Sequence, residues 1–286
     1  MNNIIFDNLI YKAKYIRDEV VRVACKNNAG HIASSFSCID ILVSLYYHIM
    51  RPFDIQVWPY NKEAWDNRDQ FILSKAHGCY GLYAILADLN IIPKAIWEDM
   101  GKSTSILKGC CEYKPEWGLD AGCGSLGHGL SIAVGLAYSA KLQNKTYNVY
   151  CLVGDGELQE GSNWEAIAFA CQQHLDNLIL VVDVNGLQAM EKTPYNCYDI
   201  VDRLVAFGFD CNIIDGHKIE ELVIMPGVSF GNPRAFLCNT VKGKGLKCTE
   251  NKPEFHYRIP TIEELKDFGN LTISTDRLTF NGEINE

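Results

Sequence analysis

The sequence lacks any apolar run near the roughly 20 residues that a membrane-spanning helix needs, so a membrane protein is not expected. It also lacks an excess of positive charge, because 35 Asp and Glu residues outnumber 26 Lys and Arg residues and give a net charge of −9. This acidic balance argues against a general nucleic-acid-binding protein. It leaves a phosphate-bearing cofactor open, since such a cofactor needs only local hydrogen-bond donors.

The 12 cysteines show no C-x-x-C spacing, which is the spacing of common zinc sites and thiol redox centres. The chain also opens without the features of a secretory signal peptide. Several cysteines, including Cys151 and Cys238, lie within apolar segments, where a free thiol packs as a small hydrophobic group. We therefore expect reduced cysteines and a cytoplasmic location.

Apolar runs and helical periodicity alternate along the chain, which contains 48% hydrophobic residues. The clearest unit is a β–α–β arrangement, with strands at 148–153 and 178–184 around a helix at 160–173. The other expected strands are 70–74, 209–214 and 235–241, and the other expected helices are 5–28, 37–49, 80–89, 126–142, 200–207 and 218–222. This alternation predicts an α/β fold with a doubly wound parallel sheet.

The chain contains no internal repeat and no low-complexity segment, so a single domain is expected over residues 1–268. Within it, residues 58–67 are expected to form a loop. Residues 269–286 are polar and are expected to be a tail, to which the sequence assigns no structure.

Polar residues follow both strands of the β–α–β unit at the point where each strand ends. Asp155 lies in a Gly-Asp-Gly sequence after the first strand, and Asn185 lies in an Asn-Gly sequence after the second. If the strands are neighbours, their ends lie about 5 Å apart, so a carboxylate and an amide oxygen could share one Mg²⁺. Each sequence alone is typical of an ordinary turn. Together they favour a site for a metal and a diphosphate.

Two weaker sequence features, a Gly-rich motif and the histidines, do not indicate a function by themselves. Residues 122–127 match the G-x-G-x-x-G pattern, but no predicted strand precedes them, so they are a poor dinucleotide motif. They remain a Gly-rich loop before a helix, which is able to cradle a cofactor. Each of the seven histidines, taken alone, is more often structural or solvated than catalytic.

Taken together, these motifs resemble the amino-terminal domain of transketolase over about residues 10–262. The segments that carry the resemblance are 30–31, 74–78, 124–129, 154–161, 183–186, 215–217, 240–245 and 254–256. Gly-Asp-Gly followed by Asn at this spacing is the thiamine diphosphate signature. The continuation Leu158-Gln159-Glu160-Gly161 and the distribution of histidines resemble transketolase in particular.

The resemblance implies thiamine diphosphate as the cofactor, with Mg²⁺, or Ca²⁺ or Mn²⁺ in its place. The metal would be held by Asp155, by Asn185 and by the carbonyl oxygen of Leu187. The residues that would contact the cofactor are His77, Gly124, Ser125, Leu126, Gly154, Gly156, Glu157, Asn185 and His256.

For catalysis, the resemblance implies that His31, His77 and His256 move protons, a role that suits imidazole because its pKa lies near the working pH. His31 and His256 would also face the substrate, as would Cys110, which stands where the family has a histidine. A thiol is mostly neutral at pH 7. The donor is therefore either an ordinary pentose phosphate that is bound differently or an unusual sugar. Glu160 would lie at a subunit interface.

The implied activity is transfer of a two-carbon ketol unit from a ketose or ketose phosphate to an aldose, through a thiamine diphosphate carbanion. In the family a second domain completes the site, and no such segment follows residue 262 here. We therefore expect a separate partner subunit of the carboxyl-terminal transketolase type, in an α2β2 assembly. The alternatives are a subunit of another thiamine diphosphate enzyme, either a 2-keto acid decarboxylase or a keto acid dehydrogenase, and a non-catalytic partner that retains the fold.

Overall fold

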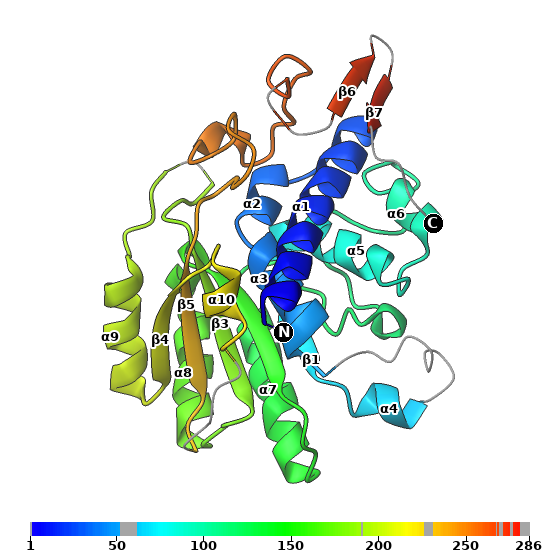
Figure 1. Ribbon diagram of the computed structural model, residues 1–286. Coiled ribbons are helices and arrows are strands. Elements are labelled where there is room, and N and C mark those ends of the chain that lie inside the picture. The colour runs from blue at the N-terminus through cyan, green and yellow to red at the C-terminus, as the bar shows by residue number, and fades with distance from the viewer. Residues whose placement is uncertain are drawn as a thin grey trace.

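A five-stranded parallel sheet forms the centre of the protein (Figure 1). In this computed structural model, the described residues are 2–51, 62–189, 191–225, 231–266, 268, 271–274 and 277–280. The strands of the sheet are β1 (Gln70–Leu73), β2 (Val149–Gly154), β3 (Leu178–Val184), β4 (Asp210–Asp215) and β5 (Arg234–Asn239). Their order is β1-β2-β3-β5-β4, and every neighbouring pair is parallel. The predicted α/β fold with a parallel sheet is confirmed.

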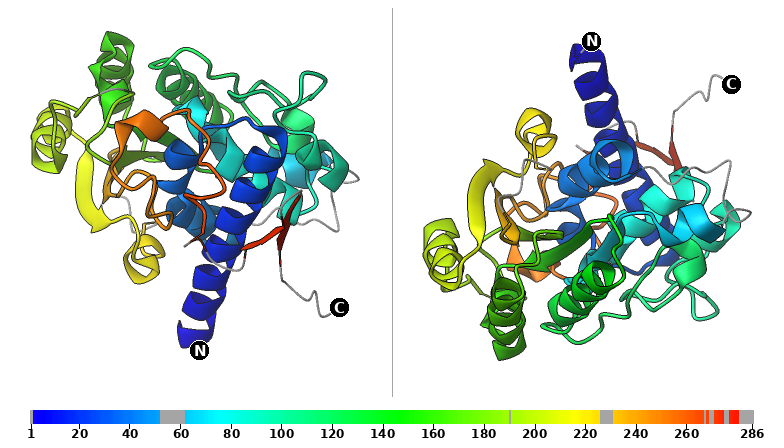
Figure 2. Two further views of the ribbon diagram at one scale, coloured as in Figure 1. Left: turned by 90° about the horizontal axis from the view of Figure 1, so that it is seen from above. Right: turned by 90° about the horizontal axis from the view of Figure 1, so that it is seen from below.

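Helices cover both faces of the sheet (Figure 1 and Figure 2). They are α1 (Asn2–Asn27), α2 (Ile32–Phe36), α3 (Ile39–Ser44), α4 (Lys62–Asp66), α5 (Cys79–Asp88), α6 (Lys94–Glu98), α7 (Gly129–Leu142), α8 (Gly161–Gln172), α9 (Cys197–Phe207) and α10 (Ile219–Leu222). Within the described part of the chain, no helix has both the length and the apolar composition to cross a bilayer.

Alternate strand residues pack against the two helical layers. Tyr150 and Leu152 belong to a core with residues of α1, α3 and α5, whereas Cys151 and Val153 belong to a core with residues of α7, α8 and α9. Successive side chains of a strand point to opposite faces. Because both faces are covered, these strands are continuous apolar runs in the sequence.

The strand register brings several loops to one edge of the sheet. Leu73 pairs with Leu152, and Asp183 pairs with both Gly154 and Cys238. The segments that follow β1, β2, β3 and β5 therefore converge at the carboxyl edge, where ligands bind in open parallel sheets. The start of α2 joins them, because the Gly243 amide donates to the Ala33 carbonyl at 3.0 Å.

The helix expected at 37–49 is found as α3, which begins at Ile39, followed by a π-helical turn at Leu45–Ile49. Helix α2, which lies before it and is separated from it by a break, has no counterpart among the expected elements. At the break, the Ser37 hydroxyl bonds to the Ser34 carbonyl at 3.2 Å and to the Asp183 carboxylate at 2.6 Å. Side-chain hydrogen bonds of this kind compete with a continuous helix.

Two further helices and two strands have no counterpart among the expected elements. Residues 62–66 of the expected loop form α4, while 58–61 lie outside the described residues. Helix α6 follows Pro93 and is too short to show an apolar period. In the tail, β6 (Leu271–Ser274) and β7 (Arg277–Phe280) form an antiparallel hairpin beside α1 (Figure 1).

Candidate active site

A cavity of about 210 Å³ lies at the carboxyl edge of the sheet. The residues expected from the sequence that line it are His77, Leu126, Gly154, Asp155, Gly156, Glu157, Asn185, Leu187 and His256. Gly124 and Ser125 are exposed in the same loop as Leu126 but do not line the cavity. The structure thus brings residues from five separate segments of the chain to one place.

Asp155 and Asn185 lie side by side at the ends of β2 and β3. Asp155 is 1% exposed, and its two carboxylate oxygens accept from the amides of Gly156 at 2.8 Å and Gly186 at 2.6 Å. The Asn185 amide oxygen accepts from the Leu187 N–H at 3.1 Å. The expectation that the two strands are neighbours is confirmed by their register.

This donor set suits a hard divalent cation. Among the described residues, no lysine or arginine forms an ion pair with Asp155, and burial together with the charge of Asp183 raises the pKa of Asp155 to about 6. A divalent cation at the carboxylate would offset that cost. One carboxylate with an amide and a carbonyl oxygen leaves room for phosphate and water, as Mg²⁺ prefers. The described part holds no group of three His, Cys, Asp or Glu side chains that could bind a metal, so carbonyl-type oxygens are needed.

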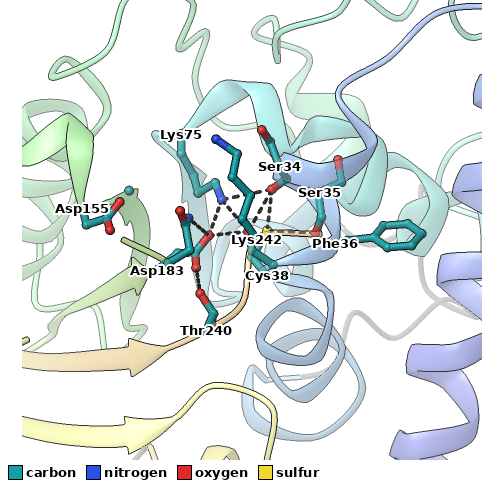
Figure 3. Close-up of polar contacts among 12 residues, drawn as sticks. Ser34, Ser35, Phe36, Cys38, Lys75, Asp155, Asp183, Thr240 and Lys242 are labelled. Atoms are coloured by element: carbon teal, nitrogen blue, oxygen red, sulfur yellow. Dashed lines mark hydrogen bonds and ion pairs between the residues drawn. The ribbon is translucent and has the colours of Figure 1, made fainter. Parts of the chain in front are cut away.

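A buried ion pair between Lys75 and Asp183 lies next to the proposed metal ligands (Figure 3). Lys75 is 1% exposed and Asp183 is fully buried, and the Lys75 ammonium donates to the Asp183 carboxylate. Burial favours the neutral form of a lysine, yet the adjacent carboxylate raises the pKa of Lys75 above its usual value. Burial likewise disfavours ionised Asp183, but Lys75 and two hydroxyls lower its pKa on balance. The pair is therefore charged.

The Glu157 carboxylate forms hydrogen bonds that fix the Gly-rich loop to the end of the sheet. It accepts from the Gly127 amide at 3.0 Å, from the Gly154 amide at 3.1 Å and from the Ser74 hydroxyl. These bonds join the loop to the ends of β1 and β2. At Gly129, where α7 begins, an added Cβ would lie 2.7 Å from the Ser74 Cα, so only glycine permits this approach. Glu157 lines the cavity while its oxygens bind the protein itself.

Three imidazoles form one cluster, of which His77 and His256 line the cavity and His31 does not. The ring centroids of His31 and His77 are 6.1 Å apart, and His256 lies 5.4 Å from each. Burial and the charge of Lys242 lower the pKa of His31 to about 4, and the same causes lower the pKa of His256 to about 4. Burial also holds the pKa of His77 well below its usual value. All three rings are neutral at pH 7.

Lys242 was not singled out from the sequence, although it lies in one of the motifs of the resemblance. Its ammonium donates to the Gln188 carbonyl at 2.7 Å and lies 3.2 Å from His256 Nδ1. Burial and the neighbouring charge of Lys75 lower the pKa of Lys242 to about 8. It therefore contributes a positive charge to the cavity at neutral pH.

Two further polar groups were also missed. Ser34 lines the cavity, and among the described residues nothing hydrogen-bonds to its buried hydroxyl. Tyr257 is 62% exposed, and its ring meets the His31 ring edge-on with centroids 4.7 Å apart. The sequence signal was its position directly after His256. Both side chains add contact surface beside the imidazoles.

Cys110 does not line the cavity, so its substrate-facing role stays a prediction. Its loop is held to the start of α5, because the Cys79 thiol lies 3.2 Å from the Gly109 carbonyl and Tyr83 donates to the Cys110 carbonyl at 3.4 Å. Burial and the neighbouring Cys111 raise the pKa of the Cys110 thiol. It is therefore a neutral group at pH 7.

Glu160 is exposed and caps the start of α8. It lies against the Gly-rich loop, since a Cβ added at Gly127 would stand 2.6 Å from the Glu160 Cβ. This position leaves the carboxylate on the surface beside the candidate site. The expected role of Glu160 at a subunit interface stays a prediction.

A parallel α/β sheet with a carboxylate–amide pair, a Gly-rich loop and lysines at its carboxyl edge is typical of diphosphate-binding domains. The chain belongs to the transketolase amino-terminal family. The model of this family, described as the thiamine diphosphate binding domain of transketolase, matches residues 10–266.

Three comparisons with known proteins define the extent of the similarity. One of the named subunits of the apulose-4-phosphate transketolase of Actinobacillus succinogenes is 38% identical, over 93% of this chain and 98% of that protein. Human transketolase is 37% identical, over 85% of this chain but only 38% of that protein. A solved transketolase from Leishmania mexicana has a TM-score of 0.79 at 22% identity, over 90% of this chain and 40% of that chain, which supports the fold alone.

Proposed function

We propose that this chain is the cofactor-binding subunit of a two-chain transketolase, which moves a two-carbon ketol unit from a ketose phosphate to an aldose. The observation that carries the proposal is the cavity at the carboxyl edge of the sheet. It is lined by the Asp155–Asn185 pair and by the neutral imidazoles of His77 and His256, and the neutral His31 ring lies beside both of these imidazoles. One site therefore offers a metal-binding end and a proton-transferring end.

Thiamine diphosphate, when bound, supplies the nucleophilic carbon and the electron sink for breaking a carbon–carbon bond. Asp155, Asn185 and the Leu187 carbonyl would hold its Mg²⁺, or Ca²⁺ or Mn²⁺ in that place. The ammonium of Lys242 and the amide of Gly156 would face the diphosphate. His31, His77 and His256 are neutral and can each accept or donate a proton at a sugar hydroxyl.

The partner and its stoichiometry are part of the proposal. This chain covers nearly all of a relative that is named as one subunit of its enzyme, but about two fifths of the longer transketolases. That contrast favours a separate carboxyl-terminal-type subunit, and we propose an α2β2 complex. The 12 thiols, all unpaired in this structure, suit a reducing compartment, and we place the complex in the cytoplasm.

For the substrate we propose a small ketose phosphate, with a branched or otherwise modified carbon skeleton as the specialised case. Cys110, a neutral thiol in place of the family's histidine, supports the specialised case. The name of the Actinobacillus relative, which includes apulose 4-phosphate, also favours it. Profiling donors with the reconstituted complex tests this: xylulose 5-phosphate as the best donor would exclude the specialised case.

Lys242→Met is expected to weaken thiamine diphosphate binding about 10-fold at pH 7, because a charge-assisted contact to the diphosphate is lost. The pKa of Lys242 in the free protein is about 8, so the wild-type ammonium loses its charge as the pH rises through 8. Wild-type affinity should therefore fall above pH 8, and that of Lys242→Met should not. Calorimetry with Mg²⁺ from pH 7 to 9 measures both.

The control for this prediction is Lys247→Met, which removes an exposed lysine from the same loop. It should keep the affinity and the pH profile of the wild-type protein. Identical profiles for the wild-type protein and Lys242→Met would exclude Lys242 from the diphosphate site.

Tyr257→Ala is expected to raise the KM for the ketose donor about 5- to 10-fold, because the exposed ring beside His31 offers apolar surface to the carbons of the sugar. Steady-state assays of the complex with its partner subunit measure this, and thiamine diphosphate affinity should stay unchanged. Tyr257→Phe keeps the ring, so its KM for the donor should stay close to that of the wild-type enzyme. An unaltered KM for Tyr257→Ala would place the ring outside the substrate path.

A further inference from the structure

The buried carboxylate of Asp183 contacts the amide of the proposed metal ligand Asn185. Its Oδ2 accepts from Asn185 Nδ2 at 3.3 Å, from the Ser37 hydroxyl at 2.6 Å and from the Lys75 ammonium. Its Oδ1 accepts from the Thr240 hydroxyl, on a different side of the carboxylate from Lys75 (Figure 3). Protein groups thus surround Asp183, which does not line the cavity.

A primary amide has two ends of nearly the same shape, but only the oxygen end binds a hard cation. A carboxylate accepts hydrogen bonds only, so it pairs with the NH₂ end of Asn185 and repels the oxygen end. The Leu187 N–H donates to the oxygen end at 3.1 Å. Two opposite contacts therefore select one of the two amide orientations.

We propose that Asp183 is a positioning residue that turns the amide oxygen of Asn185 toward the metal position. The inference rests on the proposed function, because it needs a cation between Asp155 and Asn185. It goes further by assigning a task to a residue that touches neither the metal nor the cofactor. Groups that orient a metal ligand in this way typically change metal affinity 10- to 100-fold when they are removed.

Lys75 and Lys242 both line the cavity, but their ammonium groups differ in how many hydrogen bonds they already form within the protein. An ammonium has three donor hydrogens. Those of Lys75 are directed to Asp183, to the Ser34 carbonyl at 3.0 Å and to the Ser37 hydroxyl at 3.2 Å. Lys75 thus neutralises Asp183 and leaves Asp155 as the carboxylate whose charge faces the cavity. Lys242 is the lysine with donor capacity for a diphosphate.

Two double variants separate orientation of the amide from loss of the ion pair. Lys75→Met/Asp183→Asn and Lys75→Met/Asp183→Leu remove the same two charges. Asparagine keeps a carbonyl oxygen for the NH₂ group of Asn185, and leucine does not. The dissociation constant of Mn²⁺ is measured by electron paramagnetic resonance on the full chain with excess thiamine diphosphate. We expect values within about 3-fold of wild type for the asparagine variant and 10- to 100-fold weaker for the leucine variant.

Thr240→Val is the matched control, because it removes a bond to Oδ1 of Asp183 without touching the Asn185 contact. It should bind Mn²⁺ within about 3-fold of wild type. Equal Mn²⁺ affinities for the two double variants, whether high or low, would overturn the inference. A wild-type chain that binds no Mn²⁺ with thiamine diphosphate would instead refute the proposed metal site.

A measurement on the wild-type protein guards against a leucine variant that does not fold. With ¹⁵N-asparagine labelling, the side-chain NH₂ signal of Asn185 is identified by its absence in Asn185→Ser. Its exchange with solvent should be at least about 10-fold slower than that of the exposed Asn144, because a buried carboxylate accepts from it. Exchange as fast as that of Asn144 would show that Asp183 does not hold the amide.

Discussion

Asp155→Ala is expected to lower the affinity for thiamine diphosphate in the presence of Mg²⁺ at least about 100-fold. Of the three proposed metal ligands, only the Asp155 carboxylate is charged. The other two are neutral carbonyl-type oxygens. Without the metal, Lys242 would be the main positive charge facing the diphosphate at the carboxyl edge of the sheet. Calorimetric titrations with and without Mg²⁺ measure the loss, and the Mg²⁺ dependence itself should disappear.

The isosteric variant Asp155→Asn gives a second readout, because it should remove the pH dependence that the buried carboxylate gives to the stability of the metal-free protein. The pKa of Asp155 is raised to about 6 in the folded state, from 3.8. The folded protein therefore loses stability as the pH rises through this range and the buried carboxylate ionises. Asparagine removes that loss, although its NH₂ end cannot accept the backbone N–H that one carboxylate oxygen accepts at every pH. We therefore expect the free energy of unfolding of the variant, relative to wild type, to rise by up to about 3 kcal/mol between pH 3 and pH 7.

The control for both Asp155 variants is Asp176→Asn. Asp176 precedes the same strand, β3, at the opposite edge of the sheet, and its half-exposed carboxylate pairs with Lys141 at 2.7 Å. Its removal should leave the Mg²⁺ dependence of thiamine diphosphate binding unchanged. Thiamine diphosphate affinity that Asp155→Ala leaves intact would reject the metal site.

Strands were the elements that the sequence predicted best, because burial on both faces leaves a continuous apolar run. The expected strand 178–184 and the observed β3 coincide, and β2 differs from the expected strand by one residue at each end. Helix α2 was not predicted, and neither was the break between α2 and α3. The break depends on the Ser37 hydroxyl reaching Asp183, which lies 146 residues further along the chain.

The site residues that the sequence predicted are likewise those that follow from a local pattern rather than from a long-range contact. Asp155 and Asn185 follow from a local rule, because each directly ends an apolar strand. Lys75 also follows a strand, but a lysine in a loop is usually solvated. Its burial depends on Asp183, which is 108 residues away. That contact exists only once the sheet has formed, so the sequence pattern did not reveal it.

The histidines were a different case, since no local pattern distinguished them. His31 and His256 are far apart in the sequence, and their rings come within 5.4 Å only because the loops before α2 and after β5 meet above the sheet. Only the resemblance to transketolase singled them out. Their lowered pKa values depend on burial and on Lys242, so the neutral state of the cluster is a property of the folded site.

Ketol transfer by the purified chain alone should be absent, and addition of its partner subunit should raise the rate at least about 1,000-fold. The described residues supply the metal ligands, the Lys242 ammonium and three imidazoles. These groups would bind the diphosphate end of the cofactor and transfer protons. The resemblance to transketolase implies that a second domain, which we expect on the partner subunit, completes the site. Preorganised groups of this kind contribute factors of that size to catalysis.

The reconstitution uses the chain and a candidate partner that resembles the carboxyl-terminal half of transketolase, with thiamine diphosphate and Mg²⁺ present. Products that have gained two carbons from a ketose phosphate are identified by mass spectrometry. A complex carrying Asp155→Ala should stay inactive while assembling normally, because Asp155 is 1% exposed and offers almost no surface to a partner chain. Full ketol transfer by the isolated chain would refute the two-subunit proposal, whereas release of CO₂ from pyruvate by the complex would assign it to another thiamine diphosphate reaction.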